Sequence, residues 1–214
     1  MRPGRGLVVL IAIYAGLLVG GLLLGRWFTE LVAFDVRPHT EPQAHTMIMT
    51  ATAVYILVSA APFVPGAEIG LGLMALLGSG IVPLVYLSTV LALSLAYLIG
   101  RLIPVSVTAA GFGMLGLRRA RDLVLQLAPL DNDARLKLLT ASAPRRIVPF
   151  LLRHRYVMLA LAFNLPGNTL LGGGGGIALA AGMSGLYKPV AYLATVVLAV
   201  APVPLLFLIT GVRP

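Results

Sequence analysis

The stretch Pro83-Leu84-Val85-Tyr86-Leu87-Ser88-Thr89-Val90 recurs later in the chain as Pro189-Val190-Ala191-Tyr192-Leu193-Ala194-Thr195-Val196. Both copies read P-x-x-Y-L-x-T-V, and each opens a long apolar segment. Upstream of each copy, at 63–66 and 163–167, a phenylalanine is followed by Pro-Gly. A break of small residues also stands before each proline, which is well suited to begin a helix. This ordered similarity predicts an internal repeat.

The breaks within each copy predict its topology in a bilayer. A helix rises about 1.5 Å per residue, and a hydrocarbon core is about 30 Å thick. Residues 46–61 and 68–77 are therefore short for a span, whereas residues 83–100 are long enough. We predict a re-entrant helical hairpin followed by a transmembrane helix, with a tilted crossing of residues 46–61 as the alternative. The second copy divides similarly and ends in a span over residues 189–209.

The two hairpins are expected to enter the membrane from opposite faces. The chain must pass from outside near His45 to inside near Arg118, which takes an odd number of crossings. Their Pro-Gly tips then meet near the midplane, in the inverted-repeat arrangement of secondary transporters. A substrate site is predicted at this junction.

The composition predicts an all-α integral membrane protein. Hydrophobic residues make up 59% of the 214 residues, and charged residues only 11%, against about 25% in soluble domains. Residues 69–100 and 156–187 carry no charged side chain. The chain has no cysteine, which excludes disulfides, thiolate metal sites and thiol redox chemistry.

The net charge of +9 is concentrated in residues 118–155, which hold nine basic and three acidic side chains. By the positive-inside rule this segment is expected to be cytoplasmic. Nucleic-acid binding is not expected, because Phe150 is the one aromatic residue there and basic residues interleaved with aromatic ones are lacking. Leu123, Leu127 and Leu130 recur at helical spacing, which favours an amphipathic helix on an anionic leaflet.

Residues 6–25 are uncharged and follow two arginines. The apolar stretch 7–24 is longer than the roughly 7 to 15 residues of a cleaved signal peptide, so we predict a retained transmembrane helix. The expected organisation is 1–45 (N-terminal transmembrane helix and outer loop), 46–117 (first repeat), 118–155 (basic cytoplasmic segment) and 156–214 (second repeat). A bacterial inner membrane is the expected location.

Glu68 is the one acidic or basic side chain between His45 and Arg101. A carboxylate at membrane depth is costly unless it is solvated, paired or protonated, so Glu68 is the predicted proton-coupling residue. The alternative is a structural role, in which a glutamate in a first helical turn complements the helix dipole.

The predicted substrate groove contains residues of both tips, the glycine run and the end of the first span, namely Pro65, Gly66, Pro166, Gly167, Asn168, Gly172, Gly176 and Arg101. Asn168 either binds substrate or caps a helix. Gly172 and Gly176 permit close helix packing or an unwound strip along a cavity. Arg101 is either a headgroup ligand or an interfacial stop signal.

Catalysis and metal binding are not expected. His39, His45 and His154 all lie outside the apolar spans, and no H-E-x-x-H motif or pair of carboxylates at site spacing occurs. Metal centres and Ser-His-Asp catalysis therefore lack the residues they need. We predict neither an enzyme nor a bound cofactor.

These motifs resemble the DedA or VTT-domain family, also called SNARE-associated Golgi proteins. The resemblance covers residues 46–209, through the Pro-Gly tip with its acid, the span ending Tyr97-Leu98-Ile99-Gly100-Arg101, the basic loop and the second Pro-Gly tip. It implies a membrane lipid translocase, with Glu68 matching the family's acidic residue. The family's two arginines around the second tip are replaced here by Ala162 and Asn168, which indicates a divergent branch without that phosphate-binding pair.

The expected function is therefore a flippase or scramblase of phospholipids or polyprenyl-phosphate lipids, with proton coupling through Glu68 where the movement is driven. Membrane lipids are the expected partners, and homo-oligomerisation is left open. Two alternatives from other classes remain at this stage. One is a small ion-coupled exporter or channel for soluble solutes, and the other is a membrane assembly protein that transports nothing.

Overall fold

The computed structural model describes residues 3–34, 41–114, 116, 118–142 and 147–210, and its secondary structure over these residues is helical. This confirms the all-α prediction for the described residues. The α-helices are α1 (Pro3–Phe34), α2 (Glu41–Ala60), α3 (Gly66–Leu77), α4 (Val82–Leu102), α5 (Val105–Met114), α6 (Arg118–Leu127), α7 (Asn132–Ser142), α8 (Ile147–Arg153), α9 (Arg155–Asn164), α10 (Gly173–Ser184), α11 (Pro189–Val200) and α12 (Pro202–Thr210). The described residues also form the 3-10 helices η1 (Ser79–Ile81) and η2 (Asn168–Leu171).

Two helical segments in the described part of the chain are long and apolar enough to cross a membrane, Ser79–Leu102 and Pro189–Thr210. The first comprises η1 and α4. The second comprises α11 and α12, which meet at Ala201 just before Pro202. Both segments coincide with the spans that the sequence predicted after the P-x-x-Y-L-x-T-V prolines.

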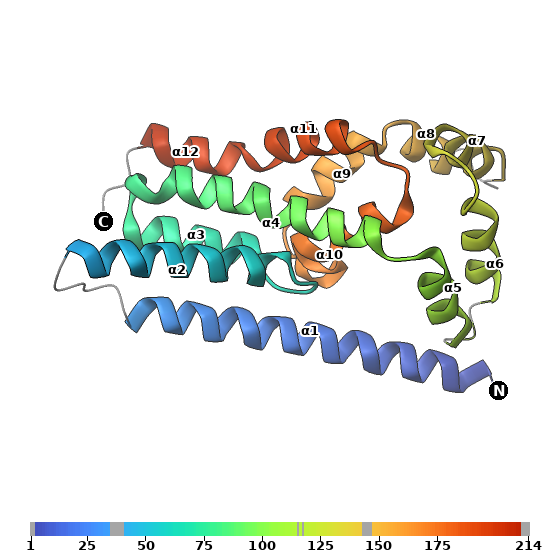
Figure 1. The fold of residues 1–214 in the computed structure, drawn as a ribbon, viewed down its shortest axis with the longest axis horizontal. Helices are drawn as coiled ribbons and strands as arrows, with labels where there is room; N and C mark the ends of the chain where they lie inside the picture. The colour runs from blue at the N-terminus through green and yellow to red at the C-terminus, as the bar shows by residue number, and fades with distance from the viewer. Residues whose placement is uncertain (1–2, 35–40, 115, 117, 143–146, 211–214) are drawn as a thin grey trace.

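The helices lie side by side along one long axis (Figure 1). Helices α2 and α3 form a hairpin whose turn points toward the middle of the molecule, and α9 and α10 form a second hairpin that reaches the middle from the opposite end. Helices α4, α11 and α12 run past both hairpins. Helices α5 to α8 gather at one end, where α1 also begins, and α12 ends at the other (Figure 1).

Proline and glycine set the helix boundaries as the sequence predicted. Pro83 and Pro189 lie in the first turns of α4 and α11, where the missing N–H costs no intrahelical hydrogen bond. Gly78 and Gly185 end α3 and α10 with φ angles of 75° and 63°, a left-handed conformation that glycine adopts without a Cβ clash. The small-residue breaks of the repeat are therefore helix ends.

The tyrosines of the two motif copies join the spans to each other. The hydroxyl of Tyr86 on α4 donates to the carbonyl of Val197 on α11 at 3.0 Å. In the opposite direction, the hydroxyl of Tyr192 on α11 donates to the carbonyl of Leu93 on α4 at 3.0 Å. The shared motif thus fixes α4 against α11 by two nearly reciprocal hydrogen bonds.

The closest helix packing is between α4 and α10, and glycine makes it possible from both sides. A Cβ on Gly100 of α4 would overlap the carbonyl oxygen of Leu179, and a Cβ on Gly182 of α10 would overlap that of Tyr97. Around this crossing lies a core that includes Leu93, Ala96 and Ala178. The second hairpin is therefore held firmly against the first span.

Candidate functional site

The first tip, defined as residues 61–66, is the turn between α2 and α3. Phe63 adopts a φ of 64° there, which costs a residue with a side chain about 1–2 kcal/mol. Its N–H donates to the carbonyl of Gly172 at 2.6 Å. The strained residue of one hairpin is thus bonded directly to the turn of the other.

The second tip, defined as residues 165–172, joins α9 to α10. Gly167 and Gly172 adopt φ angles of 73° and 111° on either side of η2. The side-chain amide of Asn168 is buried and donates to the carbonyl of Phe163 at 2.8 Å. Asn168 therefore closes its own turn, and its amide hydrogen is directed at the backbone of the second hairpin.

The glycine run lies directly against the first tip. A Cβ on Gly173 would lie 2.5 Å from the carbonyl oxygen of Val64, and a Cβ on Gly175 would lie 2.5 Å from that of Ala60. A Cβ on Gly176 would make an ordinary contact with Pro62 at 3.5 Å. The close backbone approach is therefore made by Gly173 and Gly175, and not by Gly172 and Gly176, the pair for which the sequence predicted close helix packing. The two hairpins meet here through main-chain atoms.

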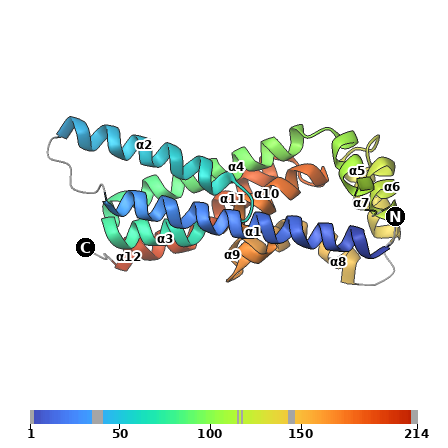
Figure 2. The same ribbon diagram turned by 90° about the horizontal axis from the view of Figure 1, so that it is seen from below.

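Helix α1 covers both tips (Figure 2). Gly21 is buried and so close to the first tip that a Cβ there would overlap the carbonyl oxygen of Phe63, and Gly25 packs against the ring of Pro65. The ring of Tyr14 stands edge-on to the ring of Phe63, with centroids 5.1 Å apart. Its hydroxyl donates to the carbonyl of Leu170 in the second tip. Sequence reasoning missed these contacts, although glycines four residues apart on α1 are a recognised signal of close packing.

A polar contact beneath the first tip involves the repeat motif. Tyr55 of α2 is buried, and its hydroxyl donates to the carbonyl of Gly66 at 3.1 Å. The same oxygen lies 3.0 Å from the hydroxyl of Thr89, the threonine of the first P-x-x-Y-L-x-T-V copy. Tyr55 thereby ties α2, the first tip and α4 together, and sequence analysis did not single it out.

Glu68 lies in the first turn of α3, just beyond the first tip, and its side chain is exposed. A carboxylate in a first turn complements the helix dipole. Within the part of the chain that the structure describes, Glu68 makes no hydrogen bond or ion pair.

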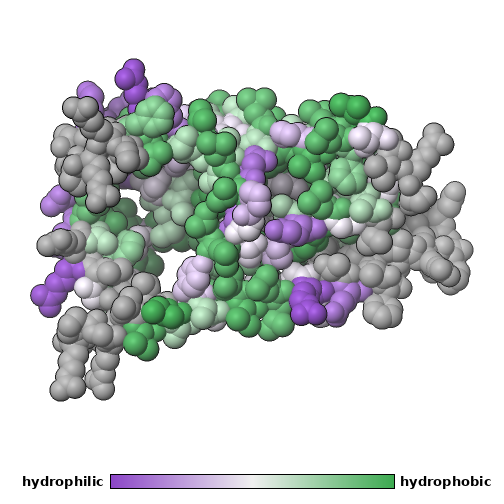
Figure 3. All heavy atoms as spheres, turned by 180° about the vertical axis from the view of Figure 1, so that it is seen from behind, coloured by the Kyte–Doolittle hydropathy of each residue, from purple (hydrophilic) through white to green (hydrophobic). Residues whose placement is uncertain are grey.

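Figure 3 shows a mainly apolar face with a few polar residues near its middle and more hydrophilic residues at the end that carries α6 to α8.

Arg101 lies apart from the two tips. It is exposed near the end of α4, where its Nη1 donates to the hydroxyl of Tyr97 at 3.2 Å. That hydroxyl donates in turn to the carbonyl of Tyr187 at 2.8 Å, and the ring of Tyr97 stacks on Tyr192 at 3.9 Å. Arg101 therefore belongs to an aromatic cluster at the end of the first span.

The structure thus gathers most of the predicted groove residues at one junction. Pro65 and Gly66 belong to the first tip, Pro166 and Gly167 are exposed in the second, and Gly172 and Gly176 join the two. No group of three or more His, Cys, Asp or Glu side chains among the described residues could hold a metal ion. Comparisons of the chain with protein-family models, with curated proteins and with solved structures find no match.

Proposed function

We propose that the protein is an integral membrane lipid translocase. In this proposal two re-entrant hairpins of opposite orientation let a lipid headgroup cross the bilayer while its tails stay in the lipid phase. The exposed apolar surface supports a membrane location, since large apolar side chains such as Leu17, Leu91 and Leu198 face outward on α1, α4 and α11. Soluble monomers rarely expose contiguous apolar patches of more than a few hundred Å².

The arrangement of the helices supports the predicted orientation. Segments Ser79–Leu102 and Pro189–Thr210 supply two spans by length and composition. Helices α6 to α8 carry most of the basic segment, and α1 begins at the same end of the molecule (Figure 1). The positive-inside rule assigns that end to the cytoplasm. The first hairpin then enters from the outer face and the second from the inner face, as in an inverted-repeat transporter.

The exposure of Glu68 is the observation that carries the proposal. Its helix begins at the first tip, so the carboxylate lies near the level at which the hairpins meet. A charge exposed to hydrocarbon is costly, so the group must be protonated or receive a polar neighbour. A passing headgroup with its water supplies that neighbour. Alternation between a protonated and an ionised Glu68 would couple such movement to a proton gradient.

The resemblance to the DedA or VTT-domain family favours a lipid as the transported molecule. The residues around the second tip indicate which class of headgroup is transported, because Ala162 and Asn168 stand where that family has arginines. The Asn168 amide is neutral and donates to the carbonyl of Phe163, so this position offers a bare phosphate no cation. We therefore propose a zwitterionic or neutral headgroup in preference to polyprenyl phosphate, whose phosphate is best bound by arginine.

The test is lipid movement in vesicles that contain the purified full chain. Fluorescent-headgroup phosphatidylcholine, phosphatidylethanolamine and phosphatidylglycerol are placed in both leaflets, and a membrane-impermeant quencher is added. We expect quenching beyond the outer-leaflet fraction with the unaltered protein and a large loss of this excess with Glu68→Gln. Glu30→Gln is the matched control, because Glu30 is also exposed but lies near the end of α1, and it should leave transport unchanged.

Three results would contradict the proposal. Quenching confined to the outer leaflet for every probe would exclude translocation of these lipids. Equal loss in both carboxylate variants would remove the special role of Glu68. Flux of protons or of a soluble dye without lipid movement would instead favour the ion-coupled exporter or channel.

A further inference from the structure

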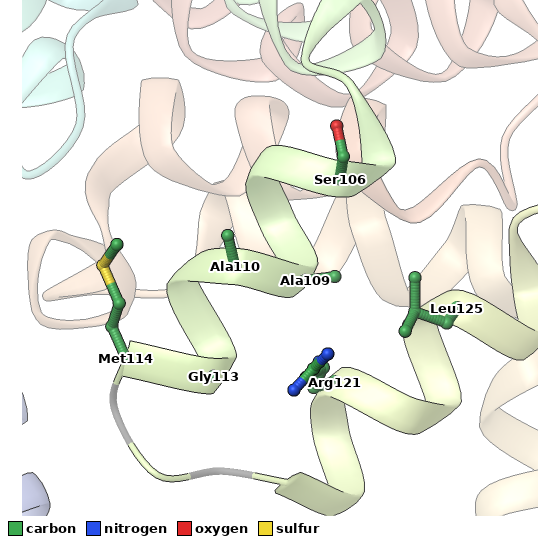
Figure 4. Close-up of a pocket in the computed structure, with 7 residues that line it drawn as sticks. All are labelled: Ser106, Ala109, Ala110, Gly113, Met114, Arg121 and Leu125. Carbon is green, nitrogen blue, oxygen red and sulfur yellow. The ribbon is translucent and has the colours of Figure 1, made fainter.

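A second site lies outside the junction, between α5 and α6 (Figure 4). It is an open groove with a volume of about 570 Å³. Its α5 wall carries Ser106, Ala109, Ala110 and Gly113, and its α6 wall carries Arg121 and Leu125. The groove is therefore apolar except for one hydroxyl and one guanidinium.

The local sequence explains why the groove exists and where its charge lies. The α5 residues recur at helical spacing on one face, and their small size leaves space that larger side chains would fill. Arg121 lies across from Gly113, where a Cβ would already touch its Cδ at 3.5 Å. Arg121 is exposed and makes no hydrogen bond or ion pair with any described residue. Its charge is thus available to a ligand.

The position of the groove matches the headgroup level of the proposed membrane. Helix α4, the first proposed span, ends at Leu102, and the groove begins at Ser106, about one helical turn further along the chain. Met114, which lines the groove, is 78% exposed, so the groove presents an apolar side chain to its surroundings. A phosphate lies at this depth in a phospholipid leaflet, with its acyl chains directed away from the polar interface.

We propose that the groove between α5 and α6 binds an anionic phospholipid. The Arg121 guanidinium holds the phosphate, the Ser106 hydroxyl donates to a headgroup oxygen, and an acyl chain lies along Ala110, Met114 and Leu125. This inference rests on the membrane location in the proposed function but not on lipid transport. It assigns a resident lipid to the basic segment, at a site distinct from the junction of the two tips.

The chemistry of the groove favours a phospholipid over a free anion. A single exposed guanidinium gives weak affinity for phosphate, because water and salt screen it. The apolar walls add binding energy only for a ligand with a hydrocarbon part. A negative amphiphile satisfies both features at once, and the positive charge of residues 118–155 enriches such lipids nearby.

The experiment is native mass spectrometry of the full chain in detergent, with phosphatidylglycerol and phosphatidylcholine of equal chain length. We expect preferential retention of phosphatidylglycerol and a several-fold loss of it with Arg121→Gln. Arg118→Gln is the matched control, since Arg118 is exposed on the same helix but does not line the groove. Ala110→Trp should also remove the bound lipid, because it fills the groove while leaving every charge in place.

Circular dichroism and thermal unfolding verify that each variant remains folded. The inference would be overturned if Arg121→Gln and Arg118→Gln bound equal amounts of phosphatidylglycerol, whether both kept it or both lost it. Full retention of phosphatidylglycerol by Ala110→Trp would also overturn it. Displacement of the lipid by an equimolar amount of sn-glycerol 3-phosphate would also overturn it, because the acyl chain would then contribute nothing. If phosphatidylglycerol binding depends on Arg121 but no lipid moves in the vesicle assay, the translocase proposal is refuted and the groove proposal stands. If lipid moves but binding does not depend on Arg121, the groove proposal is refuted and the translocase proposal stands.

Discussion

A substitution in α1 tests whether this helix holds the two tips in place. Gly20 and Gly21 are adjacent in the same helix, but a Cβ on Gly20 meets nothing within 4 Å, whereas one on Gly21 would overlap the carbonyl of Phe63. Replacing either glycine by alanine gains about 0.8–1.0 kcal/mol in helix propensity. In Gly21→Ala the backbone of the first tip or α1 must also move, at a typical cost of about 1–3 kcal/mol for overpacking.

The difference between the two variants isolates the packing cost, because the propensity gain is common to both. We expect Gly20→Ala to raise the free energy of unfolding by up to about 1 kcal/mol. The free energy of unfolding of Gly21→Ala should be about 1–3 kcal/mol lower than that of Gly20→Ala. Equilibrium unfolding in mixed micelles, followed by circular dichroism, measures both values. Equal stability of the two variants would refute the packing of α1 on the first tip.

Three further substitutions test the turns and the ties between helices. Gly167→Ala should cost about 1 kcal/mol, because its φ of 73° disfavours a side chain although a Cβ has free space there; stabilisation in the same assay would contradict this backbone conformation. Tyr192→Phe should cost about 0.5–1.5 kcal/mol through the lost hydrogen bond to Leu93, and an unchanged unfolding midpoint would argue against the contact. Arg135→Gln should cost about 1.5–3 kcal/mol, since Arg135 donates to the carbonyl of Ser184 and to two carbonyls near the end of α6; limited proteolysis should then cut residues 118–142 faster, and equal cutting rates would contradict its bridging role.

The helix boundaries around the two P-x-x-Y-L-x-T-V copies were predictable from the sequence because they depend on local chemistry, whereas the division of the second span into α11 and α12 and the start of α2 at Glu41 were not predicted. Pro83 and Pro189 start helices at positions where proline loses nothing, and Gly78 and Gly185 end them with left-handed φ angles. The apolar lengths between these residues then predicted the two long segments that the structure contains. These features need no information about which helices are neighbours.

The contacts at the junction could not be predicted in the same way, because they depend on tertiary register. The glycine run was singled out, yet two roles were open for it until the carbonyls of Ala60 and Val64 were located beside it. Two roles were likewise open for Asn168, because its burial and its bond to Phe163 depend on how the second tip closes. The packing of Gly100 against Leu179 likewise follows only from the crossing of α4 and α10.

The two halves of the repeat share a layout but contribute different groups to the junction. The first tip supplies the strained Phe63 and, one turn on, Glu68, whereas the second supplies a glycine run without side chains. Contact between them is consequently a meeting of backbones, with a hydrogen bond from Phe63 to Gly172. The stronger attachments lie elsewhere, between α4 and α10 and between α4 and α11. A movement that parts the tips would have to break the hydrogen bond from Phe63 to Gly172 and one of the contacts that Tyr14 of α1 makes with Phe63 and Leu170, while each hairpin stays anchored to its span. In the proposed translocase, the junction beside Glu68 and beneath α1 is the place where we expect a headgroup to pass.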